Sequence, residues 1–344
     1  MFANRLYIKV GNAFYVYSRS QSKRVVNESS KTSSIKIRES VRVYVLARIP
    51  SPSRAEAVEH YPQVVVIPHL GRFGNAVKEF VGAVAVAQAL GIKHLFLLGR
   101  SIFTIGGELA IPESGRASGD IRFWFNPEAG TVPLFSQVIL WSSSHFTLTA
   151  GNYNSSWKAS NQVLGLSSRR PSDPDFAIHL RGGDVFGPRD TRNYGQPPLS
   201  FYEKVLEHSN PAGVHIVYQD DRNLVLKPLE KLCERLGIHC TLQSGALKDD
   251  IETLLAAQTL VAGRGTFIPA VAGLSKILRR VYFFEDKFNI GPPRSGLEIY
   301  RVRDRVGEYA ERVLRGNWEN RPDQRELMLS YPATHLTLER LNET

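Results

Sequence analysis

Residues 176–186 read Phe-Ala-Ile-His-Leu-Arg-Gly-Gly-Asp-Val-Phe, and this stretch decides the fold that we expect. Its first five residues are mostly apolar and predict a buried strand, which ends in an arginine, two glycines and an aspartate. Side chains alternate along a strand, so His179 and Arg181 share one face and emerge at its carboxyl end. Ligands of open α/β sheets bind at that end, and glycine lets a ligand approach the backbone. The stretch therefore predicts a ligand site at the edge of a parallel sheet.

Length and composition indicate a globular protein of two domains. The chain has 344 residues, of which 42% are hydrophobic and 22% charged. Its net charge of +10 is concentrated near the beginning, because residues 1–60 hold 11 Lys and Arg against 4 Glu. Nucleic-acid binding would need a basic face on the folded domains, so we expect no nucleic-acid partner. A peripheral contact between the basic residues 1–60 and a membrane surface remains open.

The two cysteines and the apolar runs indicate the cellular compartment in which we expect the protein. Cys233 and Cys240 match neither zinc nor redox spacing and make no disulfide framework. No apolar run approaches the length of a membrane span, and Arg5 and Lys9 interrupt the first apolar residues, which therefore make a poor secretory signal. We expect a protein that is cytoplasmic or peripheral to a membrane. The alternative is the lumen of the secretory pathway, if an anchor is missing from this chain.

The sequence divides into an extension and two α/β domains. Residues 1–60 form a basic, partly flexible extension, residues 61–168 an N-terminal Rossmann-like domain, and residues 169–344 a C-terminal domain with a helical tail. In the N-terminal domain, a β-branched strand at 64–67, a helix at 76–90 capped by Gly91 and a strand at 94–98 make a β-α-β unit. Strands are also expected at 121–125 and 138–141.

The C-terminal domain repeats this alternation. We expect strands at 176–180, 214–218, 239–242, 259–262 and 281–284, with helices between them. Ser200 and Glu203 fit a capping box at the start of the first helix. The spacing of Val302, Val306 and Tyr309 predicts an amphipathic helix in the tail.

Four loops follow predicted strands, at residues 71–75, 181–184, 219–221 and 263–266. In doubly wound sheets such loops line one crevice. Gly263 and Gly265 expose backbone N–H groups before a helix that Thr266 can cap, which is a favourable place for phosphate. Arg181 could form a bidentate pair with a diphosphate. These residues predict a nucleoside diphosphate site.

Each loop also has a purely structural interpretation. The glycines at 71 and 74 could only form a turn, Arg181 could be a surface ion pair, and Asp220 and Asp221 could only cap a helix. The set is more informative than its members, because all four loops fall at the same edge of the inferred sheets.

The order of these motifs resembles that of a known family. His179-Leu180-Arg181-Gly182-Gly183-Asp184 is similar to the His-x-Arg-x-Gly-Asp motif of the α1,2-fucosyltransferase family, which is related to the α1,6- and protein O-fucosyltransferases. Residues 71–75, 218–221 and 250–275 resemble further blocks of that superfamily, in the same order.

The resemblance implies a GT-B-like fold, with two Rossmann-like domains facing a central cleft. It implies transfer of fucose from GDP-fucose to a hydroxyl of a glycan or glycoconjugate by inverting displacement, with no metal or other cofactor required. The partners would be a GDP-sugar donor and a carbohydrate acceptor. Arg181 would contact the β-phosphate and assist departure of GDP, and Asp184 is the candidate general base. The donor site would comprise Gly71, Arg72, Gly74, Asn75, His179, Arg181, Asp220, Asp221, Arg264, Thr266 and Phe267.

Departures from the family pattern keep other functions open. Gly182 stands where a second arginine is often found, for which Arg264 could compensate, and Ile268-Pro269 replaces a tryptophan pair. A non-catalytic protein that binds a nucleotide sugar or carbohydrate on the same fold is the main alternative. An NAD-dependent oxidoreductase is a weaker one, because no Gly-x-Gly-x-x-Gly follows the first strand.

Overall fold

The computed structural model describes residues 6–10, 13–19, 36–37, 43–47, 63–67, 73–89, 91–97, 117–118, 121–125, 137–140, 146–147, 174–187, 192–285 and 296–341. The chain divides into two compact units, Met1–Leu166 and Ser167–Thr344. In the described residues, the first unit contains parallel strands and the helix α1 (Phe73–Ala89), and the second unit contains parallel strands and several helices, which confirms the α/β class.

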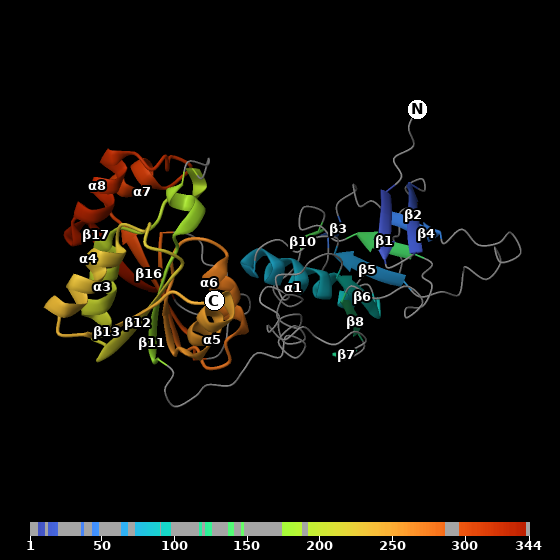
Figure 1. Cartoon of the computed structure of the whole chain (residues 1–344), viewed down its shortest axis with the longest axis horizontal. Helices are drawn as coiled ribbons and strands as arrows, with labels where there is room; N and C mark the ends of the chain where they lie inside the picture. The colour runs from blue at the N-terminus through green and yellow to red at the C-terminus, as the bar shows by residue number, and fades with distance from the viewer. Residues whose placement is uncertain are drawn as a thin grey trace, which may run out of the picture. The chain divides into compact units, whose positions relative to one another are not determined.

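In the first unit, the described residues include an eight-stranded sheet in the order β1-β2-β4-β9-β5-β6-β8-β7 (Figure 1). Its central strands β9, β5, β6 and β8 are parallel neighbours. The strands are β1 (Leu6–Val10), β2 (Ala13–Arg19), β4 (Val43–Ala47), β5 (Gln63–Ile67), β6 (His94–Leu97), β7 (Ala117–Ser118), β8 (Ile121–Phe125) and β9 (Gln137–Leu140). A separate pair joins β3 (Lys36–Ile37) to β10 (Phe146–Thr147).

Part of the basic extension contributes to this sheet. Strands β1, β2 and β4 lie within residues 1–60 and pair antiparallel with one another, and β4 pairs antiparallel with β9.

Helix α1 (Phe73–Ala89) follows β5 and is buried almost all round. It begins three residues before the predicted start, because Phe73 packs into the core with 2% of its surface exposed. Gly91 has a φ of +66° and donates its N–H to the carbonyl of Gln88, as expected for the residue that ends the helix.

The described residues of the second unit include a seven-stranded sheet in the order β13-β12-β11-β14-β15-β16-β17. Its strands are β11 (Phe176–Leu180), β12 (Gly213–Tyr218), β13 (His239–Gln243), β14 (Thr259–Val261), β15 (Arg280–Phe284), β16 (Glu298–Asp304) and β17 (Leu336–Leu341). All neighbours are parallel except β16 and β17. Numbered from β11, the parallel strands run 3-2-1-4-5-6, which is the doubly wound order of a Rossmann fold.

Helices cover both faces of this second sheet. Helices α3 (Leu199–Ser209) and α4 (Leu226–Arg235) lie on one face, and α5 (Leu247–Ala256) and α6 (Phe267–Leu274) on the other (Figure 1). Helices α7 (Glu308–Val313) and α8 (Pro322–Ser330) connect β16 to β17, and α8 packs against α3. Short 3-10 turns occur at η4 (Gly183–Phe186), η5 (Arg192–Tyr194) and η6 (Ala333–His335).

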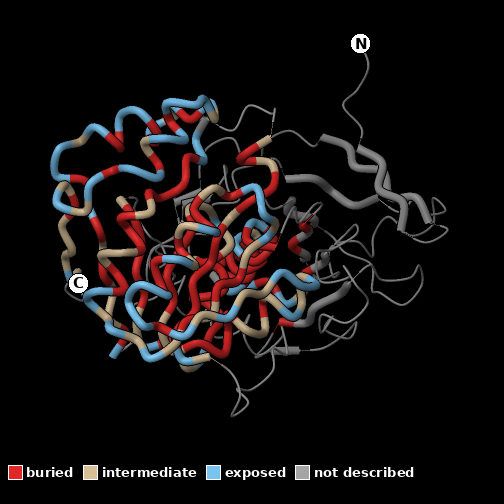
Figure 2. Tube along the Cα trace, turned by 60° about the vertical axis from the view of Figure 1, so that its left-hand side comes forward, coloured by how far each residue is buried: buried red, intermediate tan, exposed pale blue. Residues whose placement is uncertain are grey.

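The core of the second unit is centred on β11. All five of its residues are buried, and Ile178 and Leu180 are fully inaccessible. Figure 2 shows buried residues gathered in the interior of the described chain and exposed residues along its outer turns. Because β11 is enclosed on both faces, polar side chains reach solvent only beyond its end, at Arg181.

Two local predictions were wrong. Helix α3 begins at Leu199 with Pro198 as its N-cap, and no side chain caps it, so Ser200 lies inside the first turn and is buried. The glutamate of the predicted capping box, Glu203, instead pairs with Arg235. In the tail, Val302 belongs to β16 and Val306 is 59% exposed, so the helix there is confined to the short α7.

Candidate functional site

The candidate site of the second unit lies where the winding of its sheet reverses. From β11 the chain proceeds to β12 on one side, whereas β14 pairs with β11 on the other side. Loop 181–184 follows β11 and loop 263–266 follows β14, so both loops leave the carboxyl ends of adjacent strands. This topological switch point is the usual ligand position in open α/β sheets.

Arg181 occupies the centre of this edge. Its guanidinium carbon lies 4.3 Å from the centre of the Tyr194 ring, in a cation–π arrangement. Its Nη2 lies 3.4 Å from Oδ1 of Asp184, and 18% of the arginine side chain is exposed. A partly exposed cation of this kind can bind an anion without first leaving the protein interior.

Two glycines bring loop 263–266 against β11. A Cβ at Gly263 would lie 2.8 Å from the carbonyl oxygen of His179, so only glycine fits. Gly265 has a φ of +131°, and a Cβ there would lie 2.6 Å from Nη1 of Arg181. The predicted phosphate loop and the predicted phosphate-binding arginine are therefore in direct proximity.

Asp220 braces the turn that follows Arg181. Its carboxylate accepts hydrogen bonds from the backbone N–H of Gly183, at 3.1 and 3.0 Å, and from Arg222. Burial alone raises the pKa of this carboxyl, but the hydrogen bonds from Arg222 and Gly183 outweigh it and lower the pKa. This arrangement gives Asp220 a structural task, whereas Asp221 is exposed.

His179 is a buried, neutral residue. Its ring stacks on Phe267, with the ring centres 4.9 Å apart, and 9% of the residue is exposed. Burial, together with the positive charge of Arg181, lowers its pKa to about 3. The imidazole is therefore uncharged at neutral pH, and it joins the end of β11 to the start of α6.

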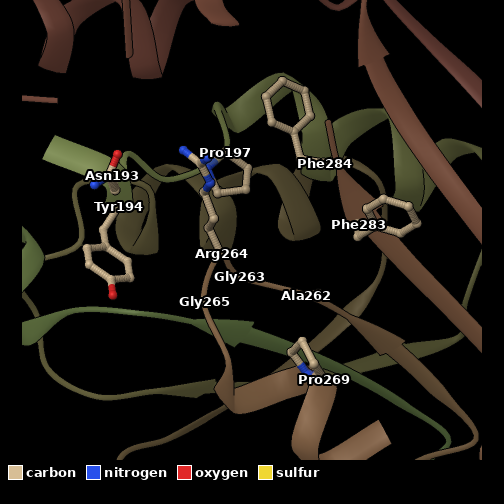
Figure 3. Close-up of a pocket in the computed structure, with 10 residues that line it drawn as sticks. All are labelled: Asn193, Tyr194, Pro197, Ala262, Gly263, Arg264, Gly265, Pro269, Phe283 and Phe284. Carbon is tan, nitrogen blue, oxygen red and sulfur yellow. The ribbon is translucent and has the colours of Figure 1, made fainter. Parts of the chain in front are cut away.

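The other two residues of loop 263–266 are Arg264, which contacts Gln196, and Thr266, which is exposed. The backbone N–H of Arg264 donates to Oε1 of Gln196 at 3.1 Å, and its side chain extends toward Pro197 (Figure 3). Thr266 is exposed and is the N-cap residue of α6, although its side chain makes no capping hydrogen bond. Thr266 is thus placed to meet a ligand at this edge.

A pocket of about 490 Å³ adjoins the loop (Figure 3). It lies at the carboxyl ends of β14 and β15, and Tyr194 and Arg264 contribute to its walls. Its other lining residues are Asn193, Pro197, Ala262, Gly263, Gly265, Pro269, Phe283 and Phe284.

Three residues that sequence reasoning missed fix the loops in place. Gln196 is 1% exposed and contacts loop 263–266 through the backbone of Arg264. Asn223 donates from Nδ2 to the carbonyl of Arg181 at 2.8 Å, and its Oδ1 accepts from Val225 N–H. Tyr194 faces Arg181. An asparagine just before a helix is a recognisable signal, whereas nothing near Gln196 or Tyr194 in the sequence announces their contacts.

The predicted donor residues of the first unit are partly described. Gly74 and Asn75 lie in the first turn of α1, where Gly74 is buried and Asn75 is exposed. Gly71 and Arg72 lie outside the described residues. The contribution of these four residues to a donor site stays a prediction.

Metal ligands, membrane spans and thiols can be assessed in the described part of the chain. It holds no group of three His, Cys, Asp or Glu residues with the arrangement of a metal site. None of its helices is long and apolar enough to cross a membrane. Cys233 and Cys240 are free thiols.

No family model matches the sequence, and no curated protein matches it. Similar solved structures include POFUT1 in complex with GDP, with a TM-score of 0.39 and 14% identity, covering 65% of this chain and 98% of that chain. POFUT1 in complex with GDP-fucose has a TM-score of 0.37 and 14% sequence identity, and the match covers 70% of this chain and 100% of that chain. The E. coli heptosyltransferase WaaC with ADP-2-deoxy-2-fluoro heptose has a TM-score of 0.38 and 11% sequence identity, and the match covers 67% of this chain and 91% of that chain.

Proposed function

We propose that this protein is a glycosyltransferase of GT-B type that transfers fucose from GDP-fucose to a hydroxyl of a glycan or glycoconjugate. The observation that carries the proposal is the juxtaposition of Arg181 with Gly265 at the switch point of the second sheet. A guanidinium beside a glycine loop that opens a helix suits a diphosphate. The resemblance of residues 179–184 to the fucosyltransferase motif supports the choice of donor.

In the proposed reaction, an acceptor oxygen attacks the anomeric carbon of fucose from the face opposite the diphosphate. The new C–O bond forms as the bond to the β-phosphate oxygen breaks, so the configuration inverts and GDP leaves with the electron pair. Arg181 stabilises the negative charge that develops on the leaving diphosphate, which is its proposed catalytic task. The charge of Arg181 takes the part that a metal ion plays in other phosphate sites, so the proposed reaction is metal-independent.

The acceptor hydroxyl must also lose its proton. Asp184 is the proposed base, as the resemblance implies, and 23% of its side chain is exposed.

A panel of donors tests the proposal. GDP-fucose, GDP-mannose, UDP-sugars, ADP-sugars and NAD are titrated by calorimetry, and donor hydrolysis and transfer to a glycan mixture are then measured. We expect GDP-fucose to bind and to turn over, and Arg181→Ala to lower the rate by about 10³. Turnover near that of the unchanged protein in this variant would refute the assignment, and tight binding of NAD without GDP would indicate an oxidoreductase.

A non-catalytic binding protein is the second candidate, and the surroundings of Gly182 favour it. A Cβ at this position would lie 2.3 Å from Oδ1 of Asp220, so the loop has no room for a second arginine. The site then offers less positive charge to a leaving diphosphate. Binding of GDP-fucose with neither hydrolysis nor transfer would support this alternative.

A further inference from the structure

An exposed aromatic ring supports the arginine of the proposed diphosphate site. Tyr194 has 40% of its surface exposed, so one side of its ring is open to solvent. The guanidinium of Arg181 lies over this ring at 4.3 Å, while Asp184 approaches it at 3.4 Å and Gly265 borders its Nη1. The ring, the carboxylate and the glycine therefore surround the guanidinium on three sides.

Gln196 ties the backbone of Tyr194 to the opposite loop. Its Nε2 donates to the carbonyl of Tyr194 at 2.7 Å, and its Oε1 accepts from the N–H of Arg264 at 3.1 Å. Its own carbonyl accepts from the hydroxyl of Tyr309 at 2.6 Å. Because Gln196 is 1% exposed, water competes little for these hydrogen bonds.

Helix α7 fixes the same segment from behind. A Cβ at Gly195 would lie 2.0 Å from the carbonyl oxygen of Val313, so the backbone here lies directly against the end of α7. Tyr309, the hydroxyl donor to Gln196, also belongs to α7 and is fully buried. Residues 194–196 are thus held by contacts that are independent of Arg181.

We propose that Tyr194 is a positioning residue for Arg181 and that Gln196 holds Tyr194 in place. The inference rests on the proposed role of Arg181 in binding a diphosphate. The ring face holds the guanidinium beside Gly265, where its donors can meet a diphosphate. A flexible arginine that is already in its binding conformation loses less entropy when the anion arrives.

The test is a double-mutant cycle with inorganic pyrophosphate as the probe. Its dissociation constant is measured by calorimetry at low salt for the unchanged protein, Tyr194→Leu, Arg181→Gln and the double variant. Pyrophosphate reports on the anion site whatever the sugar donor is. Tyr194→Phe keeps the ring face without the hydroxyl, and thermal unfolding of every variant shows whether the fold is intact.

We expect Tyr194→Leu to weaken pyrophosphate binding about 3- to 6-fold when Arg181 is present, as for a cation–π contact that is partly exposed to solvent. In the Arg181→Gln background, Tyr194→Leu should raise the dissociation constant for pyrophosphate less than about twofold. The dissociation constant of Tyr194→Phe should stay within about twofold of that of the unchanged protein.

Equal losses in both backgrounds would overturn the inference, because Tyr194 would then act independently of Arg181. No loss in Tyr194→Leu, or no pyrophosphate binding at all, would overturn it too. Cooperative losses without binding of any nucleotide sugar would leave Tyr194 as a positioning residue and refute the proposed function. If GDP-fucose is turned over but the losses of pyrophosphate affinity in the two single variants simply add in the double variant, the proposed function is supported and the positioning role of Tyr194 is refuted.

Discussion

Adding one methyl group at Gly182 is expected to destabilise the second unit by about 2 kcal/mol. The Cβ of Gly182→Ala would lie 2.3 Å from Oδ1 and 3.0 Å from Cγ of Asp220, which is closer than such atoms can approach. The carboxylate therefore has to move away from the backbone N–H groups of Gly183 and Arg222 that it accepts from.

The magnitude follows from those hydrogen bonds. A hydrogen bond to a charged group contributes about 1.5–3 kcal/mol, and we take about 1 kcal/mol for each of the two because the Asp220 side chain is 24% exposed. In a domain of this size, a loss of about 2 kcal/mol lowers the melting temperature by roughly 4–8 °C.

Gly187 provides a matched control in the same loop. A Cβ there would lie 3.5 Å from the nearest atom, the carbonyl oxygen of Asp184, which is an ordinary contact. Gly187→Ala is therefore expected to change stability by less than about 0.5 kcal/mol. Thermal and urea unfolding of both variants, followed by circular dichroism, make the comparison. Equal stability of Gly182→Ala and Gly187→Ala would refute the assigned bracing role of Asp220.

Two other variants test the surroundings of Arg181. The folded pKa of His179, about 3, lies below its unfolded value of 6.5, so its contribution to stability is full above pH 6.5 and is lost as the pH falls toward 3. From pH 7 to pH 5.5 the free energy of unfolding is expected to fall by about 1.3 kcal/mol through His179. Urea unfolding should show this fall in the unchanged protein but not in His179→Asn. Identical pH dependences of the two proteins would contradict the burial of a neutral imidazole. Gly265→Ala should cost about 1–3 kcal/mol of stability and weaken pyrophosphate binding, because the residue has positive φ and borders Nη1 of Arg181. Gly296 also has positive φ, but a Cβ there would meet nothing within 4 Å, so Gly296→Ala is the control. We expect this variant to lose stability in thermal unfolding but to keep its affinity for pyrophosphate in calorimetric titration. Equal pyrophosphate affinities of the two variants would argue against the proximity of loop 263–266 to the anion.

The sequence predicted the elements that hold the site because their signals are local. An apolar run that ends in Arg181 and two glycines identifies both β11 and the loop after it, and the glycines at 263 and 265 mark the turn before α6. The doubly wound order then follows from alternating strands and helices, since parallel strands require crossover connections.

The contacts that shape the site could not be predicted because they join distant parts of the chain. Gln196 meets Arg264, 68 residues away, and Gly182 is constrained by Asp220 through space. Ser200 shows that a local signal can also mislead: Pro198, with extended backbone at a ψ of 162°, is the N-cap two residues before the predicted one, which places the serine inside the first turn. Strand β16 was missed because the spacing of Val302, Val306 and Tyr309 suits a helix, whereas its pairing with β17, as at Arg301 and Glu339, joins segments far apart in the sequence.

The central claim is that Arg181 binds the diphosphate of a nucleotide sugar at the edge between β11 and β14. Calorimetric titration of GDP and GDP-fucose into the full chain and into Arg181→Ala tests it most directly. The claim predicts that both ligands bind the unchanged protein and that the variant binds them at least about 10-fold more weakly, as for the loss of a charge-assisted bidentate contact. Equal affinity of the two proteins, or no binding of either ligand to the unchanged protein, would contradict it.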